Sequence, residues 1–164
     1  VLIDKMSNPV GFGDRNRAAI ATMIDTVNLA LSDFDGAAPQ IATALGSDDP
    51  WIRYWALVAC SSHGKRSSLM LPTIKNLLDD EEPLVALRAI ECVALASEED
   101  PSERLYGLFS RASNPPEAVR MLNTAGVLRD SFPARFSINA SKIELAFPVA
   151  RRSQVQRRLD YLSR

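Results

Sequence analysis

Two cysteines and the single histidine are the side chains best suited to metal binding or nucleophilic chemistry. Cys60 and His63 are one helical turn apart, and Cys92 follows 32 residues after Cys60. Thiolate and imidazole groups bind Zn²⁺, but no fourth ligand is evident. His63 also has no second histidine and no evident Ser/Asp partner for nucleophilic catalysis, and its place before Gly64 predicts a helix C-terminus. Because free cysteine packs as a small apolar residue, we expect Cys60 and Cys92 in the core rather than in a metal site or a disulfide.

Acidic residues and glycines give two further patterns that could do chemistry. Residues 79–104 carry nine acidic residues and two arginines, which would suit acid–base catalysis or Ca²⁺ binding. The sequence ties no pair of these acids to a pocket, so we expect solvated turns and helix starts. Gly11 and Gly13 lack the preceding strand and the third glycine of a dinucleotide site. We therefore predict no catalytic residue, no cofactor and no metal, and we do not expect the chain by itself to be an enzyme.

Charge and hydropathy argue against nucleic-acid and membrane partners. The formal net charge is −1, which does not fit a globally basic nucleic-acid binder. Apolar runs reach only about five residues, far short of a membrane span. The tail from Arg151 to Arg164 holds five arginines and one acidic residue and would attract a polyanion, but apart from Tyr161 it lacks interleaved aromatic residues. We expect this tail to be a solvated capping helix.

An internal repeat of 33 residues organises the elements that would position any site. Pro50, Pro83 and Pro116 are spaced by 33, and each suits the first position of a helix, where the missing N–H of proline costs nothing. The register continues at i, i+4, i+7 and i+8, which is one face of an α-helix. Trp55 takes a further core position, whereas Arg88 breaks the apolar stripe. The matching core residues are Ile52, Val85 and Ala118; Ala56, Ala89 and Leu122; Ala59, Cys92 and Ala125; and Cys60, Val93 and Gly126.

A second helix precedes each of these, around residues 39–45, 72–78 and 105–109, and a short polar turn joins each pair. A helix pair of about 33 residues cannot bury its own apolar face, but stacked neighbours can. We therefore predict an all-α fold: a right-handed α-α superhelix, or solenoid, built from helix pairs.

The repeats lie between two capping regions within a single domain of residues 1–164. The expected parts are residues 1–36, a loop and a capping helix over 15–32; residues 37–130, three helix pairs; and residues 131–164, capping helices over 137–147 and 153–162. On the first capping helix the expected core-facing residues are Ile20, Met23, Ile24, Val27 and Leu31.

The start of the first repeat's second helix carries a family resemblance. Asp49-Pro50-Trp51-Ile52-Arg53-Tyr54-Trp55-Ala56 resembles the Asp-Pro-x-Val-Arg-x-x-Ala pattern of HEAT repeats. Glu82-Pro83-Leu84-Val85 is a weaker copy, and Val119-Arg120 keeps the Val-Arg pair displaced by one position. The resemblance covers roughly residues 37–130 and implies a HEAT/armadillo-like solenoid. In such proteins an arginine at the place of Arg53 commonly reaches acidic groups in the turns between repeats, so the expected partner is Asp48 or Asp80.

A narrower resemblance concerns an enzyme family. Arg53-Tyr54-Trp55-Ala56 and the upstream stretch Met23-Ile24-Asp25-Thr26-Val27-Asn28-Leu29-Ala30-Leu31 resemble the helical region behind the catalytic domain of bacterial sulfatases, of the heparan N-sulfatase or N-sulphoglucosamine sulphohydrolase-like type. The sulfatase nucleophile motif, Cys/Ser-x-Pro-x-Arg, is not in this chain. The resemblance therefore implies an accessory C-terminal piece of a hydrolase acting on sulfated sugars, in a periplasmic or secreted protein.

The second helices offer the best candidate for a binding surface. In a HEAT-like stack they line the concave face, and their off-core positions begin aromatic and apolar and become polar toward the third unit. An apolar patch rimmed by charge is typical of a protein contact. We expect a noncatalytic scaffold that binds its own catalytic domain or another protein and forms at most a weak homo-oligomer; the alternative is a free-standing HEAT-repeat adaptor. The expected partner-binding residues are Trp51, Tyr54, Leu87, Glu91 and Arg120.

Overall fold

The computed structural model describes residues 13–151 and 153–164 and is all-helical. Helix makes up 74% of it, with eight α-helices and no strand in the described part. Three 3₁₀ segments, Leu29–Leu31, Gly64–Met70 and Leu77–Asp79, connect the first helices, and a fourth, Ala140–Lys142, precedes the last one. The α-helices are α2 (Arg17–Asn28), α3 (Phe34–Leu45), α4 (Pro50–His63), α5 (Leu71–Asn76), α6 (Pro83–Ala96), α7 (Ser102–Phe109), α8 (Pro115–Ser131) and α9 (Gln154–Leu162).

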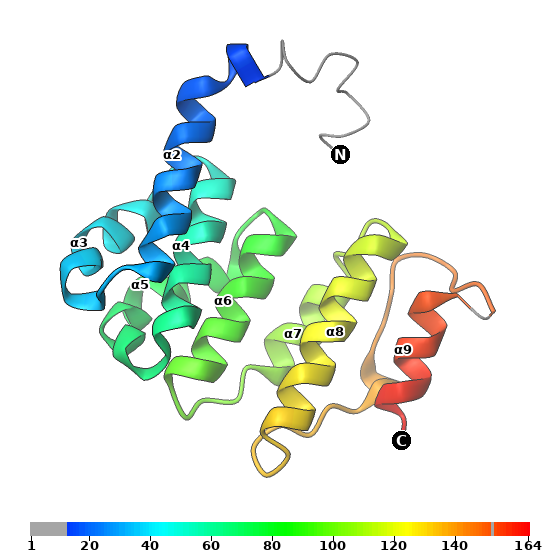
Figure 1. The fold of residues 1–164 in the computed structure, drawn as a ribbon. Coiled ribbons are helices and arrows are strands. Elements are labelled where there is room, and N and C mark those ends of the chain that lie inside the picture. Colours follow the sequence, from blue (N-terminus) through cyan, green and yellow to red (C-terminus); the bar gives the residue numbers. More distant parts are fainter. Residues whose placement is uncertain (1–12, 152) are drawn as a thin grey trace.

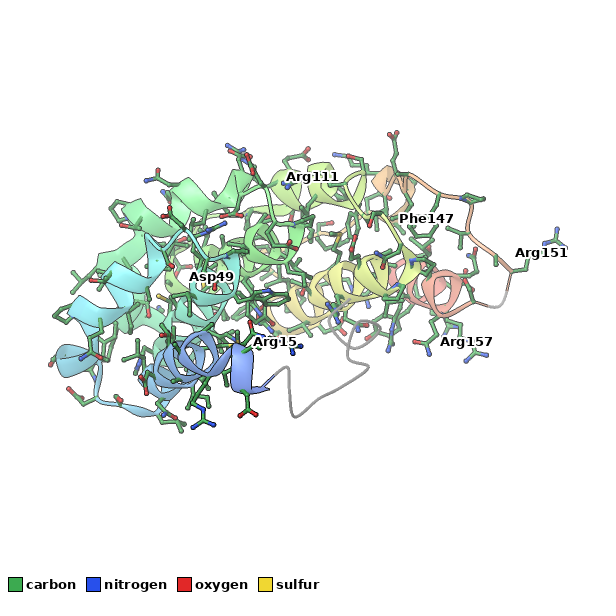
Figure 2. All side chains as sticks on the ribbon, turned by 90° about the horizontal axis from the view of Figure 1, so that it is seen from above. Arg15, Asp49, Arg111, Phe147, Arg151 and Arg157 are labelled. Carbon is green, nitrogen blue, oxygen red and sulfur yellow. The ribbon has the colours of Figure 1, made fainter. Side chains whose placement is uncertain are left out.

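One layer of the fold is a row of helices that stand side by side. Figure 1 shows α2, α4, α6, α8 and α9 following one another across the molecule, and each packs on the next. Helices α3, α5 and α7 form a second layer, in which α3 packs on α4, α5 on α6 and α7 on α8 (Figure 2). The three helix pairs expected between residues 37 and 130 are therefore present, and the all-α prediction is confirmed.

The second helix of each pair begins where the prolines and their preceding residues place it. Asp49 caps α4 by accepting a hydrogen bond from the backbone N–H of Trp51 at 2.8 Å, and Glu82 caps α6 through Leu84 at 3.4 Å. Asn114 caps α8 by accepting from the N–H of Glu117 at 3.1 Å. These side chains satisfy N–H groups that have no partner inside the helix. In the third unit the helix starts at Pro115, one residue earlier than the spacing predicts.

Small residues at the matched core positions allow the second helices to approach closely. Ala59, Cys92 and Ala125 are each at most 1% exposed, as the register predicts. The Cys92 thiol lies within 3.0 Å of the carbonyl oxygen of Leu57, so α4 and α6 meet with only a sulfur atom between them at this point. Helix α6 is buried on two sides, because it contributes residues both to the core shared with α2–α5 and to the core shared with α7–α9.

An arginine joins two consecutive turns. The Arg53 guanidinium donates to both carboxylate oxygens of Asp80, at 2.8 and 2.9 Å, and to the carbonyl oxygens of Ser47 and Asp48 at 2.8 and 3.0 Å. The side chains of Arg53 and Asp80 are only 16% and 5% exposed. Arg111 of the next turn donates to the carbonyl oxygen of Asp80 at 2.6 Å. The expected contact between Arg53 and an inter-repeat acid is thus present, and the acid is Asp80.

The expected core face of the first capping helix is only partly confirmed. Ile20, Met23 and Val27 are partly buried, and Met23 packs on the core, but Ile24 is 53% exposed and Leu31 is 86% exposed. Leu31 lies outside α2, which ends at Asn28, in the tighter 3₁₀ turn Leu29–Leu31, so it leaves the predicted helical face. The Leu29 carbonyl oxygen in this turn accepts a hydrogen bond from the His63 ring Nε2 at 3.0 Å, which ties the turn to α4.

The expected helix over residues 137–147 is also wrong, because only Ala140–Lys142 forms a 3₁₀ turn there. Side chains from 143 to 149 alternate between partly buried and exposed, which is the pattern of an extended chain lying on a core. The inward residues are Ile143, Leu145, Phe147 and Val149. The alternation of these apolar residues with less apolar neighbours is visible in the sequence, and a two-residue period predicts an extended chain rather than a helix. The last helix, α9, forms as predicted, with Ser153 as its N-cap.

We predict that Arg53→Ala destabilises the fold by about 3 kcal/mol, because it leaves the buried Asp80 carboxylate without its ion-pair partner. Arg104→Ala is the matched control: Arg104 pairs with Asp79, but both side chains are more than half exposed, so the loss should stay within about 1 kcal/mol. Denaturant unfolding of both variants measures the difference. Equal effects would contradict a special role for the Arg53–Asp80 pair.

The Arg53→Ala variant should also differ from the wild type in how its stability depends on pH. Burial by itself raises the pKa of Asp80, but hydrogen bonds from Arg53 and from the N–H of Glu82 outweigh this and hold the pKa below its usual value. A carboxylate with a lowered pKa in the folded state contributes stability above about pH 4 that is lost as the pH falls through the folded pKa. The free energy of unfolding of Arg53→Ala should therefore fall less steeply below about pH 4 than that of the wild type.

Candidate functional site

A groove lies on the outer face of α4, α6 and α8, near their N-terminal halves. Its volume is about 500 Å³. Helix α4 contributes an aromatic wall, α6 an apolar floor with one arginine, and α8 a polar wall. The groove residues are Trp51, Tyr54, Trp55, Leu84, Leu87, Arg88, Arg120, Asn123 and Thr124.

The aromatic wall consists of three rings in edge-to-face contact. Trp51 and Tyr54 lie with ring centroids 6.2 Å apart, and Tyr54 and Trp55 with centroids 5.4 Å apart at an interplanar angle of 87°. Such pairs stabilise one another beyond simple burial. Trp51 is 38% exposed, so a large apolar ring reaches solvent at the mouth of the groove.

Arg88 is held in place between the aromatic wall and its own helix. Its guanidinium lies 5.4 Å from the centroid of the Tyr54 ring and donates to the Tyr54 hydroxyl at 3.3 Å. It also forms an ion pair with Glu91, one turn further along α6, at 2.5 Å. The arginine that interrupts the core stripe in the sequence is therefore not a packing defect. It links α6 to α4, and its charge is neutralised by Glu91.

The α8 wall carries polar groups that are not used inside the protein. Arg120, Asn123 and Thr124 form no side-chain hydrogen bond and no ion pair with any residue in the described ranges 13–151 and 153–164. Glu117, one turn before Arg120, is already engaged by the Ser113 hydroxyl and the Asn114 amide. The guanidinium, amide and hydroxyl on this wall are thus available to a ligand.

Four of the five expected partner-binding residues meet in this groove: Trp51, Tyr54, Leu87 and Arg120. Glu91 lies outside it and acts through Arg88. Leu87 does not protrude as an exposed contact, because only 6% of it is accessible; it forms the floor instead. Trp55 was expected in the core but is only partly buried, and it lies in the groove wall with its ring against Tyr54.

No protein-family model, no curated protein and no solved structure matches this chain. In the described part of the chain no three His, Cys, Asp or Glu side chains come together in a way that would hold a metal ion. None of the described helices combines the length and apolarity that a bilayer crossing requires.

The two cysteines are buried and unpaired. Cys60 and Cys92 are each 1% exposed, and neither forms a disulfide. Burial raises the pKa of the Cys60 thiol to about 12 and also raises that of Cys92. A protonated thiol is a poor nucleophile and a poor metal ligand. His63, the last residue of α4, packs edge-on against Phe34 with centroids 5.2 Å apart, which assigns it a structural contact near the helix C-terminus.

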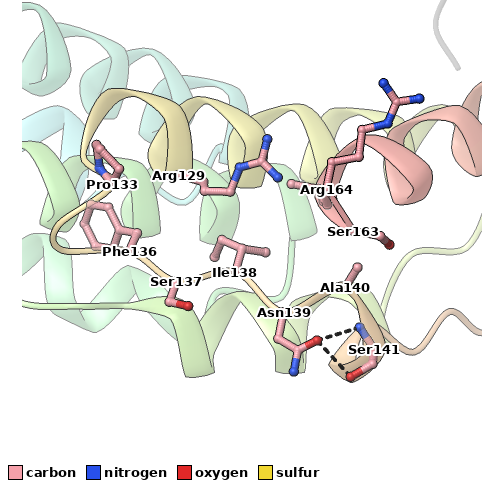
Figure 3. A pocket seen from close by; sticks show the side chains of 11 residues that line it. Arg129, Pro133, Phe136, Ser137, Ile138, Asn139, Ala140, Ser141, Ser163 and Arg164 are labelled. Carbon is pink, nitrogen blue, oxygen red and sulfur yellow. Dashed lines mark hydrogen bonds between the residues drawn. The ribbon is translucent and has the colours of Figure 1, made fainter.

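A second cavity, of about 580 Å³, lies between the segment after Pro133 and the end of α9 (Figure 3). Its basic residues are Arg129, which donates to the carbonyl oxygen of Tyr161 at 3.1 Å, and Arg164. Of the other described tail arginines, Arg151 and Arg157 extend from separate places in Figure 2, and Arg158 lines a different pocket; Arg152 lies outside the described residues. We therefore rank this cavity below the groove as a candidate site.

We predict that the native protein resists thiol reagents. With an aromatic disulfide reagent at pH 8, Cys60 and Cys92 should react at least about a hundredfold more slowly than a free thiol, because labelling requires the core to open. Both should react at once in guanidinium. The control Ser62→Cys places one exposed thiol on α4, and this new cysteine should be labelled rapidly while Cys60 and Cys92 are not. Rapid native labelling of the wild type would contradict the burial.

Proposed function

We propose that this chain is a noncatalytic helical-repeat scaffold that binds a protein partner through the groove of α4, α6 and α8. The observation that carries the proposal is the groove itself, which joins an exposed tryptophan, an apolar floor and an arginine whose guanidinium donates no hydrogen bond within the described residues. Tryptophan, tyrosine and arginine beside a desolvated pocket are the residue types that dominate binding energy at protein interfaces. An apolar patch with a polar rim favours a protein contact over a surface without function.

We further propose that the helix pairs form a right-handed, HEAT-like solenoid. The 33-residue register, the packing of α4 on α6 and α6 on α8, and the Arg53–Asp80 contact support this arrangement. In a solenoid the second helices form a continuous binding face, and the groove lies between three of them. Stacked repeats of this kind present a surface for a partner and need no catalytic group.

For the biological context, we propose the C-terminal helical part of a sulfatase-like hydrolase acting on sulfated sugars, in which the groove contacts the catalytic domain. The resemblance of residues 23–31 and 53–56 to such regions supports it. This context predicts a Cys/Ser-x-Pro-x-Arg motif in the same polypeptide and no sulfate-ester hydrolysis by residues 1–164 alone. Turnover of an aryl sulfate that depends on Cys60 or Cys92 would contradict it. The alternative is a free-standing HEAT-repeat adaptor for another protein.

We predict that the protein enriches ligands from a random 12-residue peptide library and that Trp51→Ala abolishes their retention. The chain has two tryptophans and both line the groove, so binding should change the intrinsic tryptophan emission of the wild type. Retention should fall by about tenfold or more, the usual cost of a lost interface anchor.

Leu69→Ala is the control, because Leu69 is 77% exposed and lies away from the groove. It should bind the selected peptides like the wild type. Circular dichroism establishes that both variants are folded, and light scattering detects weak self-association through the same groove. A failure to enrich any peptide, or equal retention by Trp51→Ala, would refute the proposed function.

A further inference from the structure

We propose that the groove selects an acidic partner segment, in which an apolar side chain seats on Leu84 and Leu87 and a neighbouring carboxylate pairs with Arg120. This inference depends on the proposed function and specifies the chemistry of the partner. It is drawn from the distribution of charge and hydrogen-bonding groups around the groove.

One arginine of the groove has no hydrogen bond or ion pair of its own in the described part of the chain. No aspartate or glutamate is among the residues that line the groove. Of its two arginines, Arg88 is neutralised by Glu91 at 2.5 Å and is fixed against Tyr54. Arg120 forms no hydrogen bond or ion pair within the described residues; Glu117, one turn earlier, attracts it only at longer range and is bonded to Ser113 and Asn114. The donors of the Arg120 guanidinium are therefore the ones that a ligand carboxylate would meet.

The hydrogen-bonding groups near Arg120 also favour an acidic ligand. Asn123 and Thr124 lie on the same wall, and neither side chain is bonded to another described residue. A guanidinium donates several hydrogen bonds and accepts none, and an amide and a hydroxyl each add a donor. A carboxylate and the adjoining backbone carbonyl groups of a peptide would satisfy these donors together, since planar guanidinium groups match carboxylates in a bidentate geometry.

The opposite side of the groove selects an apolar side chain. Leu84, Leu87 and the ring edges of the aromatic wall enclose the floor, and a space of about 500 Å³ accommodates a few side chains from one loop or terminal segment of a partner. Burying an aliphatic or aromatic side chain there contributes the nonpolar part of the binding energy. The segment is therefore short, with its apolar and acidic residues close together.

The same geometry disfavours nucleic acid and glycan. The Arg88 guanidinium covers one face of Tyr54, so that ring offers less surface for stacking by a base or a sugar. A phosphate backbone also needs several basic residues in a row, whereas only Arg120 has a guanidinium without a bonded partner among the described residues of this groove. A peptide segment fits the groove better than either polymer.

The test is a peptide selection on three baits: the wild type, Arg120→Glu and the control Arg157→Glu. Arg157 is exposed on α9 and lines none of the cavities described above, so its variant has the same change in net charge at a remote place. Peptides enriched by the wild type and by Arg157→Glu should combine an aliphatic or aromatic residue with a nearby Asp or Glu. Arg120→Glu should lose this consensus.

Titration of the consensus peptide, followed by tryptophan emission, gives the affinity. We expect Arg120→Glu to bind about tenfold more weakly or worse, and we expect wild-type affinity to fall as salt screens the ion pair. The peptide with Asp and Glu changed to Asn and Gln should lose a similar factor on the wild type but much less on Arg120→Glu. A loss of affinity on the wild type that is much smaller on Arg120→Glu assigns that loss to the ion pair between Arg120 and the peptide carboxylate.

Different failures have different meanings. If no peptide is enriched, the proposed function fails. If the enriched peptides need Trp51 but carry no acid, or bind Arg120→Glu equally well, the groove remains a binding site and the acidic specificity is wrong. Tighter binding of a sulfated oligosaccharide or a single-stranded oligonucleotide than of the consensus peptide, measured by the same emission change, would also overturn the inference.

Discussion

The ion pair between Arg53 and Asp80 is the contact on which the geometry of the groove depends. A buried charge pair gains little net stability over apolar packing, because removing both groups from water is costly. Here the ion pair holds two turns of the chain in position. Arg53 fixes the turn before α4 through the carbonyl groups of Ser47 and Asp48, and it fixes the turn before α6 through Asp80. Since Trp51 and Leu84 stand in the first turns of these two helices, the same contact sets the distance between the aromatic wall and the floor.

The floor of the groove depends on how helix α6 is packed. It is packed on both sides, against α4 through Cys92 and small residues and against α8 through Leu87, Ile90 and their neighbours. A helix with so much buried apolar surface leaves only a narrow outer strip, and on that strip stands Arg88. An isolated arginine beside an apolar floor would be expensive to desolvate, but Tyr54 and Glu91 supply its partners. The result is a groove in which Arg88 is held by partners and the Arg120 guanidinium keeps its hydrogen-bond donors free of partners within the described residues.

The buried thiols belong to packing and not to chemistry. Cys92 occupies a place where a larger side chain would separate α4 from α6, and its sulfur also lies 3.0 Å from the Ser61 hydroxyl. Burial raises the pKa of both thiols, which keeps them protonated at neutral pH. At the N-terminal end, by contrast, Ile24 on α2 and Leu31 in the 3₁₀ turn after it are open to solvent, although their helical spacing had suggested a core face. The amphipathic pattern thus identified the helix but overestimated the width of its buried side.

The sequence by itself determined the helix pairs, their starts and much of the groove. Proline and capping residues act locally, so Pro50 and Pro83 placed α4 and α6 correctly, and a 33-residue register identified Ala59, Cys92 and Ala125 as buried. Local signals do not carry what depends on contacts between distant residues. The 3₁₀ turn after α2 is bonded to His63 and leaves Leu31 exposed, residues 143–149 follow an extended path on the neighbouring core, and Trp55 lies in the groove wall. Periodicity gives the face of a helix, but only its neighbours determine which face is covered.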